Sequence, residues 1–356
     1  MMSLKVVGLN LPEARRAARA FAEDFFEVAA LKTRSIGGLN IGSRYCHLFL
    51  PNAEENWGEL IGAFSYQFAT NFTARNVPSL CVLSRDELPV TPSIEWARNW
   101  IDSHSIVSEE ITFPYRIFID KNTGSIYLFD TYSQKGVIFI RRKSETDLRG
   151  LITPFRLMWS WIASSSNASV IHASAVTTKH GAVLFAGASG SGKSTMAINL
   201  AMAGNHLISD DCVWIQGGKI YPVFDRAKIK KNSDLARKIK EQGIPICWNE
   251  TEGDSKAFFQ VSELNRSDTT PTDLVHIFFP VIWPCVSDLT ISSKAAFERI
   301  EIDSGREVFQ NGARSKVIIA QFCKDTPSSI LWLSPNSTDN IERVYAILEK
   351  NHHAKF

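Results

Sequence analysis

The sequence predicts an α/β protein with a mixed, largely parallel sheet and an α+β unit at its N-terminal end. An apolar run, Ala182–Ala186, leads through a glycine-rich turn into a helical pattern at Met196–Leu200. This strand, loop and helix order is typical of sheets with flanking helices. Short apolar runs separated by turn residues continue on both sides of this segment, which indicates further strands in the same core.

The first element in chain order is a helix over residues 11–30. Pro12 suits its first turn, and apolar side chains then recur at about the 3.6-residue period of a helix. Two strands are expected next, around residues 31–35 and 45–50, with Gly37-Gly38 as the turn between them.

From Val107 onward, the sequence has the pattern of consecutive β-strands. Residues 115–120 and 125–129 predict a β-hairpin, and residues 136–141 predict a third strand. A helix over residues 146–163 then leads into the apolar strand that contains His172. We therefore place a domain boundary near residue 106, with an N-terminal α+β accessory domain at 1–106 and a second domain at 107–356.

The C-terminal part continues the alternation of strands and helices. Gly217-Gly218 predicts the turn of a hairpin. Asp303 is expected to begin a polar segment that leads into a helix. The other expected elements are strands at 207–209, 212–215, 220–223, 274–279 and 329–333 and helices at 233–242 and 338–350.

The segment Gly187–Ser194 has the pattern G-x-x-x-x-G-K-[ST] and predicts a phosphate-binding loop. Glycines allow backbone N–H groups to converge on phosphate oxygens, and the start of the following helix faces the same anion. Lys193 adds a positive charge, and the Ser194 hydroxyl can ligate Mg²⁺. The alternative is a surface loop rich in Gly and Ser. The expected nucleotide-binding residues are Gly187, Ser189, Gly190, Ser191, Gly192, Lys193, Ser194 and Thr195.

Two carboxylates, Asp210 and Asp211, follow the next expected strand. One of a pair in this position can hold Mg²⁺ while the other accepts the proton of an attacking hydroxyl. The alternative is a turn or helix-capping role. His172 lies in an apolar strand before the loop, where a buried structural histidine is the alternative to a functional one. The basic run Arg226–Lys231 is either a solvated face or a contact for phosphate or an acidic substrate.

Taken together, the segment from His172 to Val213 resembles the catalytic core of HPr kinase/phosphorylases, bacterial serine kinases whose sheet is similar to that of ATP-dependent phosphoenolpyruvate carboxykinases. The resemblance rests on the His, on the loop and on Gly204–Asp211, which corresponds to a Gly-His-Arg-Leu-x-Ala-Asp-Asp run. It implies that Lys193 and Ser194 bind phosphate and metal and that Asp210 is the general base.

The resemblance also implies that Asp211 and His172 assist in charge and geometry, that Asp211 and Ser194 are metal ligands, and that the chain self-associates. Thr195 stands where the family usually carries Glu. A hydroxyl cannot replace that charge. The number of metal ions bound and the presence of a phosphorolytic reverse reaction are therefore not predicted. HPr itself is not predicted as the substrate.

Composition and charge fit a soluble cytoplasmic enzyme. The chain has 356 residues, 44% of them hydrophobic, and a formal net charge of +2. The near balance of charge argues against nucleic acid as a partner, and no apolar stretch approaches the ~20 residues that cross a bilayer. The cysteines show no C-x-x-C spacing, which favours free thiols in a reducing compartment.

We therefore expect an ATP- and Mg²⁺-dependent kinase that transfers the γ-phosphoryl group to a hydroxyl, with Ser or Thr of a protein or peptide as the acceptor. Two alternatives use the same groups: a kinase for a sugar, polyol or nucleoside-like hydroxyl, and a nucleotide-dependent ATPase or switch. The sequence does not show whether the enzyme uses ATP or GTP.

Overall fold

The computed structural model divides the chain into two compact units. One comprises Met1–Leu39, Tyr45–Gly58 and Ala69–Thr146, and the other Asn40–Arg44, Glu59–Phe68 and Asp147–Phe356. The structure describes residues 9–41, 44–51, 62–69, 77–84, 93–103, 105–120, 123–140, 153–247, 256–264, 270–282, 289–306 and 312–353. No helix in these ranges is both long and apolar enough to cross a bilayer.

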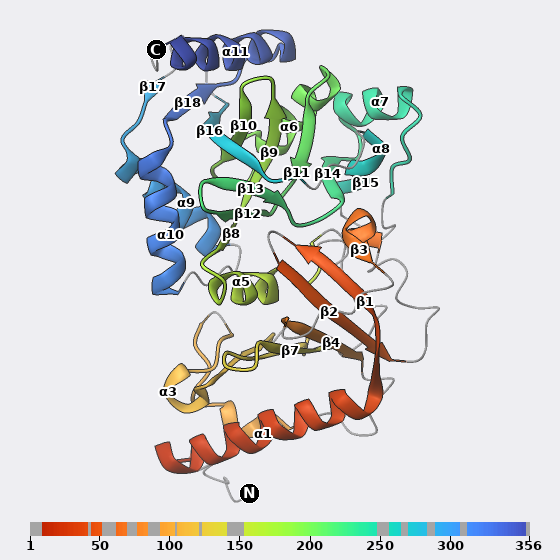
Figure 1. The fold of residues 1–356 in the computed structure, drawn as a ribbon, viewed down its shortest axis with the longest axis vertical. Coiled ribbons are helices and arrows are strands. Elements are labelled where there is room, and N and C mark those ends of the chain that lie inside the picture. Colours follow the sequence, from red (N-terminus) through yellow and green to blue (C-terminus); the bar gives the residue numbers. More distant parts are fainter. Residues whose placement is uncertain are drawn as a thin grey trace, which may run out of the picture. The chain divides into compact units, whose positions relative to one another are not determined.

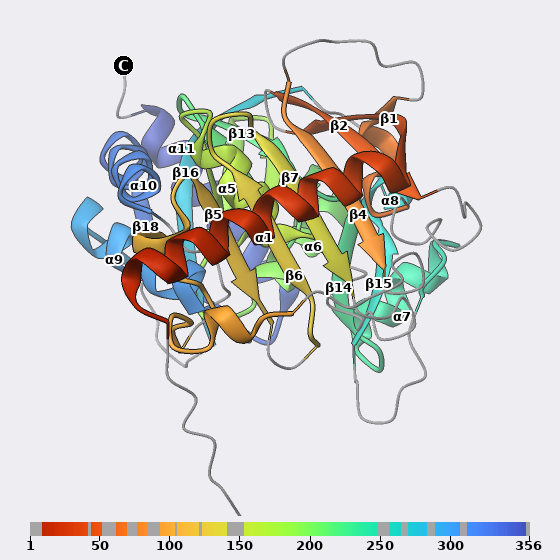
Figure 2. The same cartoon turned by 90° about the horizontal axis from the view of Figure 1, so that it is seen from below.

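A seven-stranded sheet in the order β3-β1-β2-β4-β7-β6-β5 organises the first unit, and α1 runs across its strands (Figure 2). The buried face of α1 packs on the sheet, where Phe25 meets Phe139 edge-on at 6.2 Å. The elements are α1 Leu11–Lys32, β1 Thr33–Ile41, β2 Arg44–Pro51, η2 Gly62–Gln67, β3 Phe68–Ala69, β4 Ser79–Ser84, η4 Glu95–Ala97, α3 Glu109–Thr112, β5 Tyr115–Ile119, β6 Ile126–Asp130 and β7 Lys135–Ile140.

The predicted first helix and the β5-β6 hairpin are confirmed. The turn predicted at Gly37-Gly38 is wrong, because both glycines lie inside β1. Pairing of β1 with a strand on each side outweighs the turn preference of glycine there. The units also divide at 146/147 and not near residue 106, since β5, β6 and β7 complete the sheet of the first unit.

The second unit contains a nine-stranded sheet (Figure 1) whose main path is β11-β9-β10-β16-β13-β12-β8, with β18 beside β16 and β17 beside β18. Its elements are α5 Arg156–Ser164, β8 Ser169–Ile171, β9 Ala173–Thr178, β10 Gly181–Ala186, α6 Lys193–Met202, β11 His206–Ser209, β12 Val213–Gln216, β13 Lys219–Pro222, β14 Arg226–Lys230, α7 Asp234–Glu241, β15 Lys256–Gln260, α8 Val261–Leu264, β16 Thr272–Val281, β17 Leu289–Thr290, α9 Ser293–Arg306, α10 Ala313–Asp325, β18 Ser328–Trp332 and α11 Ser337–His353.

Alternating side chains of β10 build a core on each face of this sheet. Val183 and Phe185 pack in the cluster that includes α6, α7 and α11. Ala182, Leu184 and Ala186 pack in the cluster that includes α9 and α10. The unit therefore has helices on both faces of a sheet, as expected for an α/β protein.

The sheet is mixed, as predicted, but it is not largely parallel. Among the described pairs, β10-β16 and β16-β18 are parallel, whereas β9, β12 and β13 pair with their neighbours antiparallel. Short turns such as Gly217-Gly218 force consecutive strands to run in opposite directions. That hairpin is confirmed.

Two predicted elements have different bounds. The helix expected over residues 146–163 begins at Arg156, after Phe155 in a left-handed conformation with φ 59°; residues 146–152 lie outside the described ranges. Asp303 does not lead into a helix but lies in the last turns of α9.

Candidate active site

The loop Gly187–Gly192 joins β10 to α6, so the predicted strand, loop and helix are confirmed. Gly192 precedes the helix with φ 104°, and a Cβ atom there would collide with the side chain of Leu333. The left-handed φ strains any larger residue at the point where the chain enters α6, and Leu333 would also have to shift. The first turn of α6 therefore directs its free backbone N–H groups toward this loop.

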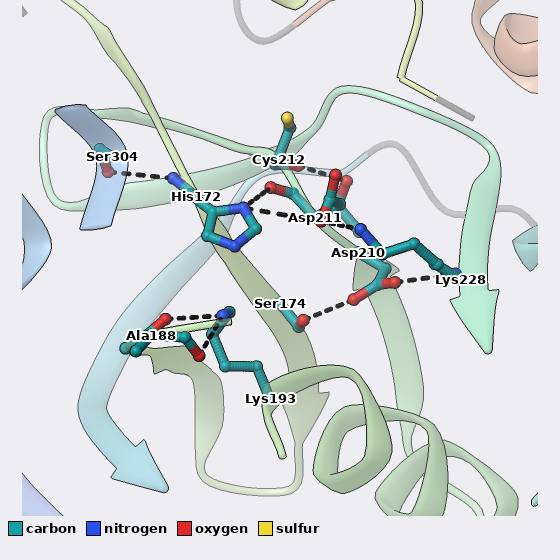
Figure 3. Close-up of polar contacts among 11 residues, drawn as sticks. His172, Ser174, Ala188, Lys193, Asp210, Asp211, Cys212, Lys228 and Ser304 are labelled. Carbon is teal, nitrogen blue, oxygen red and sulfur yellow. Dashed lines mark hydrogen bonds and ion pairs between the residues drawn. The ribbon is translucent and has the colours of Figure 1, made fainter. Parts of the chain in front are cut away.

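Lys193 lies over the loop with its side chain only 6% exposed. Its Nζ atom donates hydrogen bonds to the carbonyl oxygens of Gly187, at 2.6 Å, and of Ala188, at 3.1 Å (Figure 3). Burial lowers the pKa of Lys193, and the carboxylates of Asp211 and Asp210 act in the opposite direction. The ammonium therefore lies in the electrostatic field of both predicted acids.

Asp210 has no exposed surface, and both of its carboxylate oxygens accept hydrogen bonds. Oδ1 accepts from the Ser174 hydroxyl at 2.5 Å, and Oδ2 accepts from the backbone N–H of Lys228 at 2.9 Å. These donors come from β9 and β14, so two strands fix the orientation of the carboxylate (Figure 3). A charged group that is buried in this way needs such donors to offset its lost hydration.

Asp211 adopts a left-handed backbone conformation with φ 64° and pairs with Lys228. The Lys228 Nζ atom is 2.6 Å from Asp211 Oδ1, and His172 Nδ1 is 3.6 Å from the same oxygen. Burial acts to raise the pKa of Asp211, but the charges of Lys228 and His172 outweigh it and lower this pKa to about 2. Asp211 is therefore an anion throughout the physiological pH range.

His172 lies at a break between β8 and β9, not inside one continuous strand as predicted. Its backbone N–H donates to the Ser304 hydroxyl at 3.1 Å, and its Nδ1 atom is 2.9 Å from the backbone oxygen of Asp211. Because a carbonyl oxygen only accepts, Nδ1 carries the proton in this contact. The imidazole thus holds the backbone of Asp211 in its strained conformation.

The structure brings the four predicted catalytic residues into one cluster: Lys193, Asp210, Asp211 and His172 (Figure 3). Of the other predicted binding residues, Ser194 is half-buried, and Thr195, Ser189 and Gly190 are exposed. The Ser191 hydroxyl is buried and has no hydrogen-bond partner among the described residues.

Three members of the cluster were not predicted: Ser174, Lys228 and Ser304. Lys228 belongs to the basic run that the sequence did single out, but nothing in the run distinguishes it from its neighbours. Its strand, β14, pairs with β15, and the Lys228 backbone N–H donates to Asp210, so contacts between segments distant in sequence bring this side chain to Asp211. Arg226, in the same run, stacks 4.7 Å from the ring of Phe258.

The predicted free thiols are present in the described ranges, and Cys285 lies outside those ranges. Cys46, Cys81, Cys212, Cys247 and Cys323 are free thiols there. In the same ranges, no group of three or more His, Cys, Asp or Glu side chains is arranged to hold a metal ion.

Comparisons with known proteins add little to this geometry. No model of a known protein family matches the chain, and no curated protein matches it either. A solved structure titled "Structure of the Hpr(Ser) kinase/phosphatase from Coxiella burnetii" is similar at 14% sequence identity, over 52% of this chain and 92% of that chain, with a TM-score of 0.28.

Proposed function

We propose that this protein is an ATP-dependent kinase that transfers the γ-phosphoryl group to a hydroxyl, with Ser or Thr of a protein or peptide as the acceptor. The observation that carries the proposal is the position of Lys193, which lies on the glycine loop and within the field of Asp210 and Asp211. A phosphate-binding cation and a pair of acids in one cluster are what phosphoryl transfer requires of a protein. The sequence resemblance to serine kinases supports the same reaction.

The loop and Lys193 would bind the phosphates. The start of α6 offers N–H groups and a positive dipole end. Lys193 is held by two carbonyl oxygens, and phosphate oxygens are stronger acceptors that can replace them. The unpartnered hydroxyl of Ser191 fits the same ligand, because a buried hydroxyl without a partner costs stability unless a bound group satisfies it.

Ser194 and Asp211 fit a Mg²⁺ ion that arrives with the nucleotide. Mg²⁺ in such sites takes only one or two oxygen ligands from the protein and the rest from phosphates and water. A half-buried hydroxyl and a carboxylate with a pKa of about 2 meet that need. When bound, the ion would neutralise charge on the phosphates. Lys228 contacts Oδ1 of the Asp211 carboxylate. The ion would be held by the other carboxylate oxygen, Oδ2.

Asp210 would accept the proton of the acceptor hydroxyl. Ser174 and the Lys228 backbone fix its orientation, and His172 fixes the neighbouring residue. Because Asp210 has no exposed surface, the acceptor hydroxyl reaches it only after side chains around it move on substrate binding. Catalysis would then depend on positioning and charge more than on covalent chemistry.

The test is incubation with γ-labelled ATP and Mg²⁺, with and without a cell extract fractionated by size. Acid-stable label on serine or threonine of a protein supports the proposal. Label on a metabolite would replace it with a small-molecule kinase, and release of free phosphate alone would replace it with an ATPase or switch. Absence of any nucleotide affinity would contradict all three.

A further inference from the structure

A pocket of about 450 Å³ adjoins the glycine loop on the side of β16. Its volume is in the range of small-molecule sites, about 300–1,000 Å³. It is lined by the loop residues 187–191, by residues 279–282 at the end of β16, and by Arg299, Ile302 and Asp303 of α9. Outside the loop, Asp303 connects the pocket to the cluster, since its carboxylate acts on the charge of Lys193 and it precedes Ser304, which contacts His172.

The sheet places this pocket and the acids on opposite sides of the loop. β10 and β11 are both antiparallel to β9, so they run in the same direction, and β16 is parallel to β10. The three strands therefore end at one edge of the sheet. Along that edge, Asp210 follows β11, the loop follows β10, and the pocket lies at the end of β16. A triphosphate with its terminal group at the acids has its other end directed toward β16.

The lining of the pocket suits a nucleoside better than another phosphate. Ile282 and Ile302 expose 65% and 53% of their surface, and the exposed guanidinium of Arg299 lies over the buried ring of Phe279, with its Cζ atom 5.7 Å from the ring centroid. These groups present apolar and cationic surface to the flat face of a base. The Asp303 carboxylate also lines the pocket and would repel a phosphate but accept hydrogen bonds from ribose hydroxyls.

We propose that this pocket binds the nucleoside of the triphosphate, and that the phosphoryl acceptor approaches from the opposite side, over Lys228. The inference rests on the proposed function, because it needs a triphosphate in the loop. It adds the orientation of the nucleotide and the residues that bind its base: Ile282, Arg299 and Ile302.

The test compares Mg·ATP with Mg·tripolyphosphate, which has the phosphates without the nucleoside. Calorimetry measures both affinities for the parent protein and for the double variant Ile282→Ser/Ile302→Ser. We expect ATP to bind the parent at least about tenfold more tightly than tripolyphosphate, and the double variant to lose most of that ratio with its tripolyphosphate affinity unchanged. The matched control is Leu289→Ser/Val317→Ser, which removes two equally exposed side chains outside the pocket and should keep the parent ratio.

The outcomes separate this inference from the proposed function. If the parent binds neither ligand, both fail. If it binds both equally, or if the double variant keeps the parent ratio, the nucleoside lies elsewhere and only the inference fails. The inference also fails if the double variant spares ATP affinity but raises the KM of the acceptor, since the pocket is then the acceptor site.

A second measurement needs no substitution. Photolysis of the parent with 8-azido-ATP labels residues beside the base, and peptide mapping locates them. Label within Phe279–Ile282 or within α9 supports the inference. Label confined to β12, β13 or β14 overturns it, even if the double variant fails to fold.

Discussion

The two sides of the glycine loop differ in how their side chains are held. On the β11 side, His172, Asp210 and Asp211 are each at most 6% exposed and tied by short polar contacts. On the β16 side, Ile282 and Ile302 are more than half exposed. Groups fixed by a buried network are suited to chemistry that tolerates little misplacement, whereas exposed apolar groups gain most from covering by a ligand. We therefore expect substitutions on the β11 side to change the rate of transfer and substitutions on the β16 side to change nucleotide affinity.

The largest effect is expected at Lys193, which both sides of the loop share. Lys193→Ala removes the ammonium that would meet the phosphates, so nucleotide binding and transfer should both fall to background. Calorimetry with Mg·ATP and the labelled-ATP assay check this. Lys230→Ala, at an exposed position of β14, is the control and should leave both intact. If the Lys193 variant kept its affinity for ATP, the loop would not be the phosphate-binding site.

The next largest effect is expected on the acid side alone. Asp210→Asn removes the proton acceptor and should slow transfer about a hundred- to a thousandfold, with ATP affinity changed less than about threefold. Asp225→Asn is a matched control, since Asp225 is also fully buried and accepts hydrogen bonds from Ser262. It should lose stability but keep the transfer rate per folded molecule. Transfer at the parent rate in the Asp210 variant would show that another group takes the proton.

A smaller effect concerns the stability of the acid cluster. The pKa of Asp211 is about 2 in the folded chain, below its ordinary value of 3.8, so its ion pairs contribute stability above about pH 4 that is lost as the pH falls toward 2. Lys228→Met removes the main partner and should lower the free energy of unfolding by about 2 kcal/mol at neutral pH, with the difference shrinking between pH 4 and pH 2.

Urea unfolding of the parent and of Lys228→Met across that pH range gives the difference. The control is Lys219→Met, which breaks the exposed pair with Asp273 and should change nothing measurable. If the difference in the free energy of unfolding between the parent and Lys228→Met stayed constant with pH, Lys228 would act through packing and not through the charge of Asp211.

The smallest effect is expected on the pocket side. Arg299→Gln replaces an exposed guanidinium over Phe279 by a shorter, neutral side chain, so the KM for ATP should rise by about three- to tenfold with kcat unchanged. Steady-state kinetics with varied ATP check this. If kcat fell by the same factor as KM rose, Arg299 would take part in the transfer step. The two sides of the loop would then not differ in function.

Local patterns were enough to predict the loop and several elements. Gly187–Ser194 lies between a strand and a helix as its motif requires, and α1 and the β5-β6 hairpin follow from periodicity and turn residues. The Gly37-Gly38 turn failed because strand pairing on both sides of β1 overrides a local preference. The low share of parallel pairs could not be predicted either, since strand order depends on contacts distant in sequence.

The candidate site was predictable only where short sequence features carry it: the glycine loop, the Asp-Asp pair and the histidine before the loop. Lys193, Asp210, Asp211 and His172 were singled out by their residue types, and the structure brings them together. Lys228 and Ser304 reach the cluster through pairings with Asp211 and His172 that connect distant segments, and no periodicity encodes such contacts. The pocket at the end of β16 is likewise a product of the sheet order and leaves no sequence signature.

The most direct measurement is a crystal structure of the protein with Mg²⁺ and a nonhydrolysable ATP analogue. We predict the triphosphate in the loop Gly187–Gly192, its terminal phosphate facing Asp210 and Asp211, and the base against Arg299 and Ile302. A nucleotide bound in the reverse direction, or bound away from this loop, would contradict the account.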